Sequence, residues 1–141
     1  MTLRLENVLG CATGSGKGQP NSIQVVMVYV PSCSKNAYKF RDGRIKPEVR
    51  QWMDDLAWMI SAWSKSCKFE WTPPLKVLIS GTFKDGRSCP DVHNFVTVIA
   101  DAIEEGLGIN DREYAIETVL PNIDPTVEPR IAITITQGEE R

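Results

Sequence analysis

Apolar residues recur at helical spacing in two stretches of the chain. Between Pro47 and Trp63 they return every three or four residues, which is the spacing of one helix face, at Val49, Trp52, Met53, Leu56, Met59, Ile60 and Trp63. Pro47 suits the first turn of this helix. A second helical pattern follows Asp91, a suitable N-cap, and ends near Gly106 and Gly108. We expect two helices, the first with a wide apolar face that packs on a sheet or on a partner.

Stretches rich in β-branched and apolar residues predict strands at 22–30, 75–83, 114–120 and 130–136. Residues 10–22 are rich in Gly, Ser, Asn and Pro, which predicts a loop or tether. The expected order β, α, β, α, β, β is typical of an α+β or mixed α/β fold. We therefore expect a small sheet of about four strands covered by two main helices. Residues 1–21 would form a flexible segment and residues 22–141 a single domain.

The composition is that of one globular domain. Hydrophobic residues make up 42% of the 141 residues and charged residues 24%, which excludes a disordered or collagen-like chain. The formal net charge of -2 means that any nucleic-acid binding must come from local patches. No apolar run approaches the roughly 18 residues of a membrane span, so we expect no membrane association. Four widely spaced cysteines without a CxxC pair favour reduced thiols and a cytoplasmic location.

Several common catalytic patterns are missing from the sequence. The glycines at 14, 16 and 18 have the wrong spacing for a phosphate-binding P-loop, and Gly18 stands where such a loop has Ser or Thr. We therefore expect no nucleotide cofactor. His93 is the only histidine, which leaves too few ligands for a Cys-His zinc site. A serine hydrolase elbow, G-x-S-x-G, does not occur.

Charge is distributed unevenly along the chain. Residues 35–50 carry six basic side chains against two acidic ones, a local charge of +4, with Tyr38 and Phe40 interleaved. Residues 101–128 carry eight acidic side chains against one basic one, a local charge of -7. A metal-dependent nuclease needs such a pair of features, because cations hold phosphates and carboxylates bind the ions that polarise the scissile phosphate. The alternative is two ordinary solvated surfaces.

Asp91 and Asp111 stand on either side of the second predicted helix. A helix from Val92 to Glu105 is about 20 Å long at 1.5 Å per residue, so the two carboxylates share a site only under one of two conditions. Either the chain folds back after Gly106, or a second subunit supplies Asp111. In the alternative interpretation Asp91 is an N-cap and Asp111 a turn residue.

Two stretches around the second predicted helix have a specific sequence: residues 90–95 read Pro-Asp-Val-His-Asn-Phe, and residues 101–111 read Asp-Ala-Ile-Glu-Glu-Gly-Leu-Gly-Ile-Asn-Asp. Upstream, residues 34–38 read Ser-Lys-Asn-Ala-Tyr, and Gly43-Arg44 follows. In these motifs the sequence resembles, from about residue 34 to 135, the RusA family of Holliday junction resolvases. The family's central signature is an Asp-x-Asp-Asn stretch that opens a helix, an Asp-Ala-Leu within that helix, and an acidic pair after a glycine-containing turn, and the upstream residues resemble its N-terminal motif.

The resemblance implies a homodimeric, Mg²⁺- or Mn²⁺-dependent endonuclease that cuts four-way DNA junctions symmetrically in recombination and repair. By position, Asp91 matches the first catalytic aspartate, Asp111 the third, and His93 the second. These three residues are the expected catalytic groups and metal ligands. Asn94 is expected to orient them, and Asp101, also close to the cluster, is either a further ligand or a charge on the helix face. The expected DNA-binding residues are Lys35, Asn36, Arg41, Arg44, Lys84 and Arg87.

Three departures from the family pattern keep other functions open. His93 replaces an aspartate, Thr97 a lysine and Asn110 a frequent aspartate. Lys84 or Arg87 could supply the missing positive charge. The first alternative is a catalytically impaired protein of the same fold that still binds junction DNA. The second is a metal-independent module whose acidic half binds another protein.

Overall fold

The computed structural model describes residues 11–13, 21–87 and 89–138. Within these ranges the strands form a six-stranded sheet in the order β1-β2-β6-β3-β4, and β5 pairs with β3. The strands are β1 (Cys11–Thr13), β2 (Ser22–Val28), β3 (Leu75–Phe83), β4 (Tyr114–Thr118), β5 (Asn122–Ile123) and β6 (Arg130–Gln137). Strand β6 is antiparallel to β2 and β3, whereas β4 is parallel to β3.

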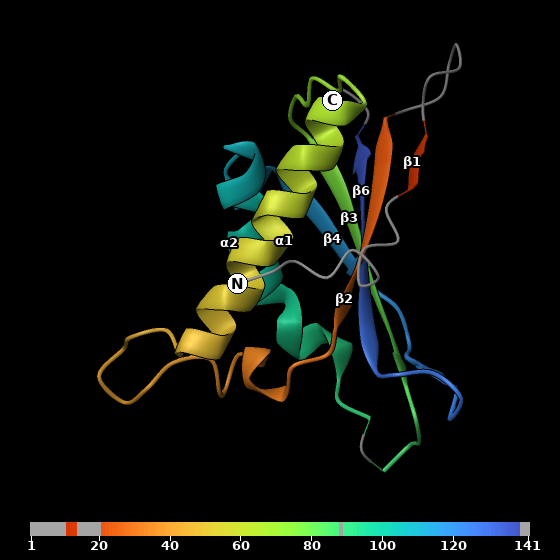
Figure 1. Ribbon diagram of the computed structural model, residues 1–141. Helices are drawn as coiled ribbons and strands as arrows, with labels where there is room; N and C mark the ends of the chain where they lie inside the picture. Colours follow the sequence, from red (N-terminus) through yellow and green to blue (C-terminus); the bar gives the residue numbers. More distant parts are fainter. Residues whose placement is uncertain (1–10, 14–20, 88, 139–141) are drawn as a thin grey trace.

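Two main helices, α1 (Pro47–Ser66) and α2 (Val96–Leu107), lie on one face of this sheet (Figure 1). Alternate residues of the strands face them, so that β2 and β6 each bury every second side chain. Trp52 of α1 joins the two layers, because its indole N–H donates to the Val28 carbonyl at 2.9 Å. The mixed sheet with two covering helices confirms the predicted α+β fold.

The helices also contact each other directly. A Cβ atom added at Gly106 of α2 would lie 2.8 Å from the Ala57 carbonyl oxygen of α1, so the backbones approach too closely for a side chain there. Arg50 of α1 pairs with Asp54 one turn on and with Glu105 of α2. Of the two glycines expected at the end of the helix, Gly106 lies within α2 and Gly108, at φ 73°, follows its last residue.

The elements differ from the sequence prediction at a few places. The first helix begins at Pro47 as expected, but residues 92–95 form a separate 3₁₀ turn, η3, before α2. Residues 11–13 form the short strand β1 within the stretch predicted as a loop, paired with β2. β5 is two residues long and too short to leave a pattern. The rest of the predicted N-terminal segment lies outside the described residues, apart from Asn21.

Cys33, Cys67 and Cys89 are free thiols. Cys33 is buried in the core, and burial, with a smaller contribution from Glu48, raises the pKa of its thiol to about 12. In the described part of the chain, no helix is both long and apolar enough to cross a membrane.

Candidate functional site

Asp91 and His93 lie on the exposed side of the η3 turn (Val92–Phe95). The buried side chains of Val92 and Phe95 anchor this turn in the core. Asp91 is its N-cap, since one carboxylate oxygen accepts the backbone N–H of His93 at 3.0 Å. Asp91 is thus an N-cap as expected, but of this 3₁₀ turn, because the N-cap position of α2 belongs to Phe95. The second carboxylate oxygen of Asp91 and the exposed imidazole of His93 are still available to a substrate.

The basic segment, residues 34–46, lies against this turn. The backbone N–H of Lys35 donates to the Asn94 carbonyl at 2.8 Å. From there the segment leads into a hairpin in which Lys39 pairs with Ile45 as an isolated antiparallel bridge. The side chains of Lys35, Asn36, Arg41 and Arg44 are all exposed. The segment that carries cations able to bind phosphates is therefore attached to the turn that presents Asp91 and His93.

Asp111 lies beyond the other end of α2. After Gly108 the chain enters a second 3₁₀ turn, η4 (Asp111–Glu113), whose N-cap Asn110 accepts the backbone N–H of Arg112 at 3.0 Å. Asn110 therefore has a structural role here, and Asp111 is exposed.

Asp101 is a partly buried residue of α2, and the pKa of its carboxyl is raised. Burial raises its pKa above 3.8 most strongly, and the nearby charges of Asp111 and Glu105 raise it further. The positive charges of Lys39 and Arg50 act in the opposite direction. Charges from the acidic stretch, from the basic segment and from α1 therefore all act on the carboxyl of Asp101.

The three predicted metal ligands do not form a complete site in one chain. Carboxylates and an imidazole have the right donor chemistry for Mg²⁺ or Mn²⁺. Within residues 11–13, 21–87 and 89–138, however, no three His, Cys, Asp or Glu side chains are grouped so that they could hold a metal ion. The electrostatic neighbours found for Asp111 are Asp101 and Tyr114. One chain in this conformation therefore has no preformed three-ligand site among these residues.

The remaining predicted residues lie on the surface. Lys84 and Arg87 are exposed in the connection between β3 and η3, and Thr97 is exposed in the first turn of α2. Sequence reasoning did not select Lys39 and Arg50, the two cations whose charges reach Asp101. Both belong to the basic residues 35–50, but their position relative to Asp101 depends on the tertiary fold.

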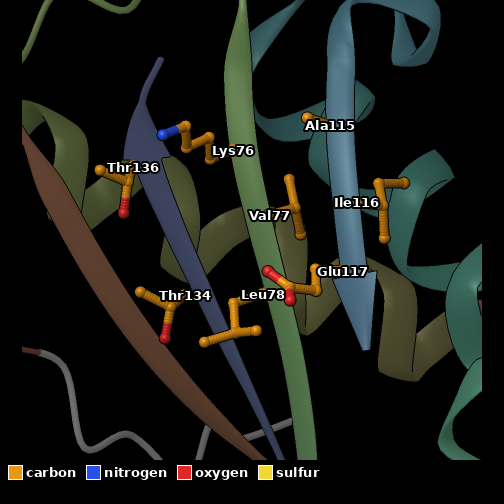
Figure 2. Close-up of a pocket in the computed structure, with 8 residues that line it drawn as sticks. All are labelled: Lys76, Val77, Leu78, Ala115, Ile116, Glu117, Thr134 and Thr136. Atoms are coloured by element: carbon orange, nitrogen blue, oxygen red, sulfur yellow. The ribbon is translucent and has the colours of Figure 1, made fainter. Parts of the chain in front are cut away.

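A groove on the sheet lies apart from these residues (Figure 2). It runs between β6, β3 and β4 on the face that α1 and α2 leave uncovered, where exposed Lys76 and Leu78 alternate with buried Val77 and Ile79. Glu117 and Thr134 also line it. None of the predicted site residues lines this groove.

Comparison with known proteins gives a family match that covers most of the chain. The model of a family described as endodeoxyribonuclease RusA matches residues 29–136. No curated protein matches the sequence.

Among solved structures, similarity was found to the OmpA-like domain of FopA1 from Francisella tularensis. The identity is 10%, the TM-score 0.40, and the match covers 96% of this chain and 85% of that one. The periplasmic domain of Helicobacter pylori MotB matches at 9% identity and a TM-score of 0.44, over 99% of this chain and 86% of that one. Similarities this weak carry no functional information.

Proposed function

The chain belongs to the RusA endodeoxyribonuclease family, whose members resolve Holliday junctions, and from this premise we propose that it cuts four-way DNA by metal-dependent, symmetric phosphodiester hydrolysis. The observation that carries the proposal is the family match over residues 29–136. The hydrogen bond between Lys35 and Asn94 supports it, because it joins a cationic segment to the turn that presents Asp91 and His93.

In this proposal Asp91, His93 and Asp111 are required for hydrolysis. Asp91 also holds its own turn through the backbone of His93, which fixes where both side chains emerge. Asn94 and Asp101 act as positioning residues, Asn94 because its carbonyl fixes the basic segment. DNA backbone contacts are assigned to Lys35, Asn36, Arg41, Arg44, Lys84 and Arg87.

The proposal includes a requirement for Mg²⁺ or Mn²⁺. Carboxylates suit both ions, and the imidazole of His93 shifts the preference toward Mn²⁺. Protein treated with EDTA should be inactive on junction DNA and should regain cleavage when either metal is added. Full cleavage in EDTA would contradict the requirement while leaving the nuclease assignment intact.

A homodimer is the proposed working unit. Two equivalent nicks in a four-way junction need two equivalent sites, and a twofold dimer supplies them. We place the protein in the cytoplasm, where DNA and reduced thiols such as Cys33, Cys67 and Cys89 occur together.

The central experiment compares cleavage of a labelled four-way junction with cleavage of a linear duplex of matched sequence. Paired symmetric nicks confined to the junction support the proposal. Asp91→Asn should lower cleavage by about 10²-fold or more, the size expected for a lost acid–base or charged group at the reacting centre. Junction affinity should stay within a few-fold, because asparagine still caps the turn.

Asp124→Asn is the matched control. Asp124 accepts the backbone N–H of Thr126 at 3.0 Å, the same local geometry as at Asp91, so both variants remove one charge from the same kind of turn. The control should cleave normally. Equal loss in both variants would contradict the role of Asp91.

The second candidate is the catalytically impaired junction binder. Its motivation is His93, Thr97 and Asn110, together with the lack of a grouped three-ligand site among the described residues. It predicts a gel shift of junction DNA without nicks in either metal. In that case His93→Asp, which restores the family's residue, should bring cleavage back. A protein that binds no DNA would contradict both candidates and favour the protein-interaction module.

A further inference from the structure

The basic segment contains a preformed hairpin, residues 39–45. Lys39 and Ile45 pair across its base, and the backbone N–H of Phe40 donates to the Arg44 carbonyl at 2.9 Å. Gly43 closes the turn, donating to the Phe40 carbonyl at 3.0 Å with a φ of 90° that favours glycine. The hairpin therefore has its own hydrogen bonds, and a ligand would not have to order it.

Phe40 is exposed on this hairpin although it is apolar. Its exposed fraction is 43%, and the guanidinium of Arg44 lies 5.4 Å from its ring centroid. Arg44 is itself held in place, because its Nε donates to Asp42 at 2.7 Å. One exposed aromatic side chain is ordinary in a soluble protein. An exposed aromatic ring on an ordered hairpin among Lys39, Arg41 and Arg44 is a more specific combination.

That combination matches the two needs of a protein that binds unpaired nucleotides. Cations follow the phosphates, and an aromatic ring stacks on a base face that has no neighbour. A linear duplex offers no such face, since its bases are stacked on both sides. In an open four-way junction stacking is interrupted at the branch point, so a base there can be contacted at a lower cost in unstacking.

The hairpin belongs to the same basic segment that is attached to the Asp91 turn. It projects from the molecule near the start of α1, as the gold loop at the lower left of Figure 1. Its segment is attached to Asn94 by Lys35, and the charge of Lys39 reaches Asp101. The hairpin is thus connected to the Asp91 turn through a short stretch of the same segment, so that DNA bound at the turn could extend along the segment toward the hairpin.

We propose that Phe40 stacks on a base at the branch point and that this contact lets the protein distinguish junctions from linear duplex. The proposal rests on the proposed function, since it assumes a DNA junction at the site. It assigns Phe40 to specificity and not to hydrolysis.

The test measures the affinity of the full-length protein for junction and duplex, and the fluorescence of 2-aminopurine placed at the branch point. Phe40→Ala should weaken junction binding about tenfold, the size of one base–aromatic stack. Duplex binding should stay within about twofold, and the salt dependence of binding should not change, because no charge is removed. The fluorescence change seen with wild-type protein should be lost. Phe40→Trp should preserve selectivity.

Trp58→Ala is the matched control, because Trp58 is an exposed aromatic residue on α1 with an exposed fraction of 56%. It should leave both affinities and the fluorescence signal unchanged.

Three outcomes overturn the inference. The first is that Phe40→Ala leaves the junction-to-duplex ratio and the fluorescence as they are, the second that it weakens both substrates equally, and the third that it changes the oligomeric state in sedimentation. If the wild-type protein cuts junctions in the same experiments, the proposed function stands in each of these cases. A wild-type protein that does not bind junction DNA overturns the proposed function and this inference together.

Discussion

At the scale of single residues, Asp91 has one role that the structure shows and another that it leaves open. Aspartate before a helical turn is a good N-cap, and the hydrogen bond to the His93 backbone confirms that role. The sequence pattern for a cap and for a catalytic aspartate is the same here. Only the family signature around it points to catalysis, so the role of Asp91 in hydrolysis stays a prediction.

Asp101 is expected to destabilise the folded protein at neutral pH. Burial, followed by the charges of Asp111 and Glu105, raises its pKa above 3.8. A carboxyl with a raised folded-state pKa favours the protonated folded form. Its penalty is therefore complete above the folded-state pKa, shrinks as the pH falls through that pKa, and is absent below the unfolded value. Asp101→Asn should accordingly unfold at a higher urea concentration than wild type at pH 7.

This difference in urea midpoint should disappear as the pH falls below about 3.8. Asp124 provides a control of opposite sign, since hydrogen bonds from Thr126 lower its pKa. Removing the charge of Asp124 should not raise the midpoint at pH 7. If Asp101→Asn is the less stable protein at pH 7, attraction to Lys39 and Arg50 outweighs burial.

At the scale of elements, the contact between α1 and α2 depends on one glycine. Glycine in a helix interior usually lowers stability relative to alanine. At Gly106, however, a Cβ would meet the Ala57 backbone at 2.8 Å, and backbone cannot move aside like a side chain. We expect Gly106→Ala to lower the free energy of unfolding by about 1–3 kcal/mol, as overpacking does.

Gly86→Ala is the comparison for this prediction. A Cβ at Gly86 meets no atom within 4 Å, so the change in unfolding free energy should stay within about 0.5 kcal/mol. Thermal or urea denaturation of the two variants checks both values. A Gly106→Ala protein as stable as wild type would mean that the helices can separate without cost.

At the scale of the whole molecule, the question is how Asp91 and Asp111 could serve one reaction. Asp91 precedes η3, Asp111 follows α2, and α2 alone has 12 residues, about 18 Å at 1.5 Å per residue. No three potential metal ligands are grouped in the described part of one chain. The chain after Gly108 brings Asp111 within electrostatic range of Asp101, part of the way back along α2. Both conditions therefore stay predictions: a return of the same chain, or a site shared between two subunits.

Mixing two inactive variants tests that arrangement. If each site takes Asp91 from one chain and Asp111 from the other, a mixed dimer of Asp91→Asn and Asp111→Asn has one intact site and one site lacking both groups. We expect the mixture to regain cleavage, as single nicks instead of paired cuts. A mixture of Asp91→Asn with His93→Ala should stay inactive, because both changes fall on the same turn. An inactive first mixture, with subunit exchange shown by cross-linking, would place each site within one chain.

The sequence by itself determined the parts of this protein that depend on local pattern. Helical periodicity predicted the two helices, and stretches rich in β-branched and apolar residues predicted the four longer strands, because these signals lie within each segment. Two of the strands end earlier than predicted, β2 at Val28 and β4 at Thr118. The short strands β1 and β5 have too few residues for any period to be visible. The capping role of Asp91 and the end of α2 at Gly108 followed from side-chain and backbone preferences of single residues.

Only the tertiary structure decided which of these parts meet. The basic segment is separated from Asn94 by more than forty residues, yet Lys35 binds the Asn94 carbonyl directly. The charge of Lys39 likewise acts on Asp101, although α1 and β3 lie between the two residues in the sequence. Such contacts depend on how the layers pack, and no periodicity along the chain records them.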